Sequence, residues 1–281
     1  MHAPLDPGKL DQMSDPHVAP PDRWVDLPRR VGSAILLAAL AVFALWFGGL
    51  AWDVTCSVIG IGIAFEWLEL CKMPPRRLPG ALMIAIFALI WGAMMFGFAP
   101  PLLVLGIYAA MIGLMVARPW LGIGLAYTGL SVWAMIWLRH GPYGFGDLLF
   151  LLPVVWATDV GAYTTGRVFG GPKLAPHISP GKTWAGALGG AFASSLVGAA
   201  IAGGLAGDPT RAALVAAICS AASQLGDLGE SWAKRHFGVK DSGNLIPGHG
   251  GLFDRLDGTM AASFVAVVLA LLAGPGAYLW R

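Results

Sequence analysis

Acidic side chains gather between residues 227 and 257 of a chain in which only 12% of residues are charged. Asp227, Glu230 and Lys234 have the spacing that aligns side chains on one face of a helix. Asp254 and Asp257, three apart, form a second such pair. Carboxylates that converge from two helices repel each other unless a cation lies between them. Because the candidate ligands are all oxygens, the pattern predicts Mg²⁺, although ion pairs at a solvated helix end would also fit it.

Cations and glycines surround these acids. Several basic side chains could neutralise phosphates, and several glycines would let backbone N–H groups approach anionic oxygens closely. Together with a metal ion, these parts suit phosphoryl or nucleotidyl transfer, which relies on positioning and charge stabilisation. His249 either donates to a phosphate or braces the loop. The cations are Lys234, Arg235, Lys240 and Arg255, and the glycines are Gly243, Gly248, Gly250 and Gly251.

A second polar segment covers residues 159–186. It begins with Asp159, a carboxylate that would be costly in a membrane without a partner. Its SPGKT stretch resembles the end of a P-loop, but Pro176 stands where the first glycine of that motif is required. We therefore reject the P-loop and expect a basic, glycine-rich loop that touches a nucleotide or lipid phosphate. Its basic residues are Arg167, Lys173, His177 and Lys182.

The remainder of the chain is apolar, and 57% of all residues are hydrophobic. Several apolar runs reach the length of about 20 residues that crosses a bilayer. We expect an all-α, polytopic membrane bundle of about nine spans. The predicted spans lie near 31–49, 52–71, 80–98, 101–117, 120–138, 148–167, 184–204, 211–233 and 258–280.

Basic residues predict the orientation of these spans, because Lys and Arg accumulate in cytoplasmic loops. With the N-terminus inside, only Arg139, Arg211 and Arg281 of the 18 Lys and Arg residues fall on the outer side. Both polar segments then face the cytoplasm, where nucleotides are available, and the protein would lie in the inner membrane. The net charge of +2 is too small to indicate a nucleic-acid partner.

The chain divides by composition into three parts. Residues 1–30 are polar and Pro-rich, which predicts a disordered cytoplasmic tail. Residues 31–145 form the N-terminal membrane helices, and residues 146–281 form a catalytic membrane region with polar loops. Glu66, in the second predicted span, either faces the active cavity or has no part in it. The sequence leaves open whether the chain forms a homo-oligomer.

The polar cluster at residues 231–257 resembles the signature of phosphatidate cytidylyltransferases, also called CDP-diacylglycerol synthases. The signature is a Ser two residues before Lys-Arg, then Lys-Asp, then His-Gly-Gly, then Asp-Arg-hydrophobic-Asp. The resemblance extends through QLGDLGES, DVGAY and SPGKTW, although Ala185 stands where the family more often has a polar side chain. The matching residues are Ser231, Lys234, Arg235, Lys240, Asp241, Gly243, Pro247, His249, Gly250, Gly251, Asp254, Arg255 and Asp257.

The resemblance implies a Mg²⁺-dependent reaction of CTP with phosphatidate that gives CDP-diacylglycerol and pyrophosphate. It implies that Asp227 and Asp254 hold the metal, and it leaves a second cation open. The implied catalytic residues are Lys234, Arg235, Lys240, Asp241, His249, Arg255 and Asp257. The implied substrate-binding residues are Asp159, Arg167, Lys173, Ser179, Lys182, Ser231, Gly250 and Gly251.

Two other classes of membrane protein also use acidic residues within the bilayer. CDP-alcohol phosphotransferases also hold metal with paired aspartates, but their Asp-Gly-x-x-Ala-Arg motif fails at Asp257-Gly258, where no Arg follows. A transporter would use membrane acids as ion sites, typically near the midplane. Here the densest polar cluster lies at one predicted interface, which favours the enzyme.

Overall fold

The computed structural model describes residues 39–72, 119–243, 245, 250–274 and 279–280. Within these residues, six helices are long and apolar enough to cross a membrane. The protein is therefore a multi-pass helical membrane protein. The helices are α3 (Gly49–Leu70), α6 (Pro119–His140), α7 (Gly144–Phe169), α8 (Trp184–Gly204), α9 (Pro209–His236) and α10 (Phe253–Ala273).

These six helices correspond to six of the predicted spans, so the predicted helical membrane class is confirmed. The largest differences are at the last span, which begins at Phe253 and ends at Ala273. The predicted spans 80–98 and 101–117 and the predicted tail lie outside the described residues. The count of nine, the cytoplasmic N-terminus and the three-part division stay predictions.

A short β-hairpin stands where the sequence analysis expected only a loop. Strands β1 (Lys173–Ala175) and β2 (Ser179–Thr183) pair antiparallel, with Lys173 opposite Thr183. The hairpin connects α7 to α8, and Gly170, the residue after the end of α7, has a positive φ of 60°. Thr183 caps α8, because its hydroxyl accepts a 3.1 Å hydrogen bond from the Gly186 N–H. SPGKT is thus an extended strand that leads into a capped helix.

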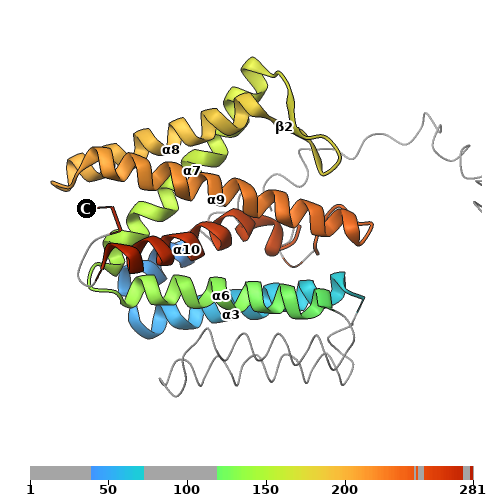
Figure 1. The fold of residues 1–281 in the computed structure, drawn as a ribbon. Helices are drawn as coiled ribbons and strands as arrows, with labels where there is room; N and C mark the ends of the chain where they lie inside the picture. The colour runs from blue at the N-terminus through green and yellow to red at the C-terminus, as the bar shows by residue number, and fades with distance from the viewer. Residues whose placement is uncertain (1–38, 73–118, 244, 246–249, 275–278, 281) are drawn as a thin grey trace, which may run out of the picture.

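Helices α9 and α10 lie side by side between two other pairs (Figure 1). The α7–α8 pair packs against α9, and the α6–α3 pair packs along the other side of α10. Small residues let α7 and α8 approach closely: a Cβ at Gly161 would lie 2.6 Å from the Ala193 Cβ. The Thr165 hydroxyl also donates to the Ala185 carbonyl at 3.1 Å.

The contact between α9 and α10 depends on two glycines. A Cβ at Gly226 would lie 2.6 Å from the Ala261 Cβ and 2.7 Å from the Asp257 carbonyl oxygen. A Cβ at Gly258 would lie 2.4 Å from the Ser223 hydroxyl. Because these glycines let the backbones touch, the acids beside them, Asp227 and Asp257, are brought together.

We expect Gly226→Ala to lower the unfolding temperature in detergent, since overpacking of this kind costs about 1–3 kcal/mol. Gly229→Ala is the matched control on the same helix, because a Cβ there meets no atom of the described part of the chain within 4 Å. That control should be neutral or slightly stabilising, as alanine favours helix by about 1 kcal/mol over glycine. Equal melting temperatures for the two variants would contradict the close-contact argument.

Candidate functional site

Helix α9 carries the predicted stripe of polar side chains. The helix spans Pro209–His236 without a break, and the Asp208 carboxylate caps its start by accepting from the Thr210 N–H. Asp227, Glu230 and Lys234 therefore share one face, as their spacing predicts. Glu230 is buried with only 4% of its surface exposed, whereas the Asp227 side chain is 41% exposed, so only part of this face is in contact with solvent.

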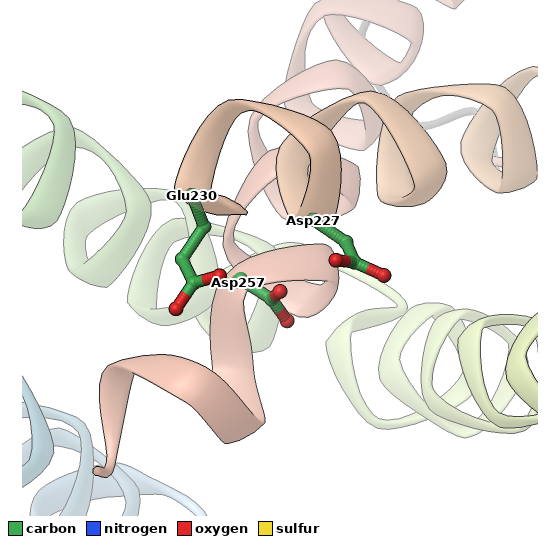
Figure 2. Close-up of side chains that lie close together, drawn as sticks. All are labelled: Asp227, Glu230 and Asp257. Carbon is green, nitrogen blue, oxygen red and sulfur yellow. The ribbon is translucent and has the colours of Figure 1, made fainter. Parts of the chain in front are cut away.

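Three carboxylates from α9 and α10 form an acid cluster, which consists of Asp227, Glu230 and Asp257. One oxygen of each lies within 4.8 Å of the others. In Figure 2 the Asp257 carboxylate lies between those of the two α9 residues. Glu230 was predicted to lie on the stripe but not in the site, although its i, i+3 spacing from Asp227 is the sequence signal for that role.

Basic and polar groups flank the outer side of the acid cluster. Lys182, at the end of β2, forms a 2.5 Å ion pair with Asp227. The Ser231 hydroxyl also donates to Asp227 at 3.5 Å. Asp159 of α7 is close enough to interact electrostatically with Asp227, Lys182 and Asp257. The structure thus brings the predicted residues Asp159, Lys182, Ser231, Asp227 and Asp257 together from four elements.

Lys234 connects the other side of the acid cluster to Asp254. Its ammonium group lies 2.7 Å from Glu230 and 2.8 Å from Asp254. The Asp254 carboxylate also accepts from the Ser242 N–H at 3.1 Å and from the Gly251 N–H at 3.2 Å. Asp254 is outside the acid cluster, and its oxygens bind a lysine and two backbone donors. The predicted metal role of Asp254 has no support in this geometry and stays a prediction.

Glu66 of α3 holds the same loop from the opposite side. This side chain is only 2% exposed, and it accepts from the backbone N–H groups of Leu252 at 2.7 Å and Phe253 at 2.8 Å. The Ser242 hydroxyl donates to it at 3.1 Å. Its carboxylate therefore sits at the N-terminus of α10, where the helix dipole and unpaired N–H groups favour an anion. The residue serves the site by positioning this loop.

Glycine at 251 is required by these two carboxylates. A Cβ there would lie 2.0 Å from the Ser242 hydroxyl, 2.9 Å from Glu66 and 3.0 Å from Asp254. The neighbouring Gly250 has a φ of +84°, which L side chains rarely adopt. The sequence predicted that such glycines approach anionic oxygens, and Gly251 does approach them, but the oxygens belong to Glu66 and Asp254.

The other predicted residues lie around this centre with fewer contacts. Arg235 donates to the Val239 carbonyl at 3.1 Å, and Arg167 donates to the Tyr163 hydroxyl at 3.1 Å. Ser179 begins β2 opposite Ala175. His249 lies outside the described residues. Lys173, Lys240, Asp241 and Arg255 have exposed side chains.

The donor set of the acid cluster suits a divalent cation. It offers carboxylate oxygens without cysteine or histidine, which is the chemistry that Mg²⁺ prefers. Three carboxylates so close together would repel each other in a partly apolar bundle without positive charge between them. The residues present therefore fit a metal ion such as Mg²⁺ at Asp227 and Asp257, with Glu230 shared between this site and Lys234.

Comparison with known sequences identifies the family. The sequence pattern of the cytidylyltransferase family matches residues 28–273, and the chain belongs to this family. This confirms the resemblance seen in the signature residues.

Relatives named phosphatidate cytidylyltransferase match over most of their length. That of Brucella suis biovar 1 is 38% identical over 265 residues, which cover 89% of this chain and 96% of the relative. That of Pseudomonas aeruginosa is 36% identical over 277 residues, 89% of this chain and 95% of the relative. That of Bacillus subtilis is 31% identical over 269 residues, 89% of this chain and 100% of the relative.

We expect Glu66→Gln to lower the unfolding temperature, because the amide loses the charge and one acceptor that serve buried donors, at a cost of about 1–3 kcal/mol. Glu69→Gln is the control: it lies one turn along α3, its side chain is exposed, and it should change stability by less than about 0.5 kcal/mol. Thermal unfolding in detergent measures both. If Glu66→Gln and the control unfold at the same temperature, the hydrogen bonds from Glu66 to the start of α10 contribute nothing to stability.

Proposed function

We propose that the protein transfers the cytidylyl group of CTP to phosphatidate, giving CDP-diacylglycerol and pyrophosphate, with Mg²⁺ bound by the acid cluster. The observation that carries the proposal is the meeting of Asp227, Glu230 and Asp257 with Lys182 and Lys234 at one end of a membrane bundle. Membership of the cytidylyltransferase family and relatives named phosphatidate cytidylyltransferase supply the substrates.

The nucleophile in this reaction needs little activation. A phosphatidate oxygen is anionic at neutral pH, so no strong general base is required when it attacks the α-phosphorus of CTP in line. The bond from that phosphorus to the bridging oxygen breaks, and pyrophosphate leaves. When bound, Mg²⁺ would neutralise triphosphate charge at Asp227 and Asp257. The chain's own task is to position the two substrates and to stabilise charge.

Two lysines have different positions for this task. Lys182 stands on the hairpin, and its ammonium nitrogen is buried against the Asp227 carboxylate, so we assign it to offsetting charge at the metal site. Lys234 is only 12% exposed and is held by two carboxylates, so we assign it to keeping Glu230 and Asp254 in place as well as to offsetting charge. The exposed side chains of Arg235, Lys240 and Arg255 would bind phosphate oxygens, and Asp241 would orient one of these cations.

The remaining substrate-binding assignments concern the hairpin and α7. Arg167, Lys173 and Ser179 would bind the nucleotide phosphates from the hairpin side, and Asp159 would support the cation at Asp227. We place this end of the bundle at the cytoplasmic face of the inner membrane, because the distribution of Lys and Arg supports that orientation. CTP would then reach the site from water and phosphatidate from the bilayer.

Incubation of the purified protein with labelled CTP, phosphatidate and Mg²⁺ tests the reaction. We expect a CDP-lipid and pyrophosphate in equal amounts. Absence of both products, with detergent and lipid varied, would overturn the proposed function.

Asp227→Asn and Asp257→Asn test the metal assignment. Each should lower kcat by at least about 100-fold, since charge at the reacting phosphate is then poorly compensated, and each should raise the Mg²⁺ concentration for half-maximal rate. Asp208→Asn is the matched control on α9, because asparagine also caps helices well. Wild-type Mg²⁺ dependence in both cluster variants would exclude these two ligands.

Asp254→Asn separates metal binding from loop support. From the contacts to Lys234, Ser242 and Gly251 we expect a lower unfolding temperature with an unchanged Mg²⁺ requirement. A raised Mg²⁺ requirement at unchanged stability would instead favour the ligand role that the family signature implies.

A further inference from the structure

An apolar groove of about 650 Å³ runs along the membrane helices beside the acid cluster. It lies between α6, α9 and α10, with Trp67 of α3 at one end, and its volume is that of a small-molecule site. Its walls are almost entirely apolar, and Glu230 is the one charged residue among the described residues that line it. Representative lining residues are Ile123, Tyr127, Ala221, Leu225, Gly229 and Phe264.

The groove extends from the polar end of the bundle into the bilayer. Along α9 it reaches from Glu230 to Ile218, about 18 Å at 1.5 Å per residue. That length is close to the depth of one leaflet, about 15 Å of hydrocarbon. Trp120 and Trp232 line the end of the groove that is near Glu230. Tryptophan is enriched at the membrane interface, which fits this end of the groove.

Glu230 belongs both to the groove and to the acid cluster. A molecule that lay along the groove would therefore have one end beside the carboxylates and Lys234. Among the described residues, no atom would lie within 4 Å of a Cβ at Gly229, so none of them closes the groove at this position. The apolar groove, which is about as long as one leaflet is deep, therefore ends at the acid cluster.

We propose that this groove holds one acyl chain of phosphatidate while the head group reacts at the acid cluster. The assignment rests on the proposed function, which requires a lipid whose phosphate comes to these carboxylates. The groove has the length of an acyl chain, apolar walls and a polar end at the site, so it fits this occupant. A membrane helix of another protein would also find apolar walls here, but it would not require the groove to end at the acid cluster.

Two substitutions that fill the groove test the assignment. Ala221 is about 13 Å from Glu230 along α9, which is beyond the reach of a six-carbon chain, so Ala221→Phe fills the far part of the groove. Gly229→Leu fills the groove beside its polar end. We expect the ratio of kcat/KM for dipalmitoyl over dihexanoyl phosphatidate to fall about tenfold in both variants, because several methylene groups lose apolar contact. Ala200→Phe and Gly204→Leu on α8 are matched controls, since both sites are exposed and lie outside the groove.

A wild-type ratio in both groove variants, with unchanged unfolding temperature, would overturn the proposal. Photocrosslinking with a phosphatidate that carries a diazirine at the chain end gives a readout without turnover. Labels on α6, α9 and α10 that are lost in Ala221→Phe support the groove, whereas labels confined to other outward faces, or retained in this variant, contradict it. If the wild type forms no CDP-lipid but shows the groove labels, the proposed function fails and the lipid site stands.

Discussion

The site depends on the capture of the α10 N-terminus by two carboxylates. Glu66 accepts from the first N–H groups of the helix, and Asp254 accepts from Ser242 and Gly251 in the preceding loop. A helix end inside an apolar bundle leaves donors that must be satisfied, and an anion there also interacts favourably with the helix dipole. Because Glu66 comes from α3, the N-terminal helices fix where α10 begins, and hence where Asp257 lies one turn later.

The second constraint is the electrostatic balance of α9 and α10. Gly226 and Gly258 allow the two helices to touch, which places Asp227 and Glu230 of α9 beside Asp257 of α10. The repulsion that results is offset at both sides by a lysine: Lys182 reaches Asp227 from the hairpin, and Lys234 lies between Glu230 and Asp254. The remaining negative charge is what gives such a cluster affinity for a divalent cation.

Much of this architecture could be predicted from the sequence, because hydrophobic length and helical spacing are local properties. Six spans were placed to within a few residues except at α10, and Asp227 and Asp257 were correctly expected near one another. The partners of each charge could not be predicted, because they depend on how helices pack. Lys234 was assigned to phosphates, yet it is held by Glu230 one turn away, and the acceptor role of Glu66 involves residues 176 to 187 positions along the chain. The hairpin was missed because its strands are too short to show a periodic pattern.

The charges of the polar loop therefore divide into two physical roles that the sequence does not distinguish. Those with low exposure, Glu66, Glu230 and Lys234, bind each other, Asp254 or backbone N–H groups, and they hold the start of α10 in place. Those with more exposed side chains, such as Arg235 and Lys240, would be the ones to bind phosphate oxygens in the proposed reaction. Catalysis that relies on positioned charge gains most from donors that need no rearrangement. A buried charged frame beside exposed cations would therefore suit the proposed reaction, in which one substrate comes from water and the other from the bilayer.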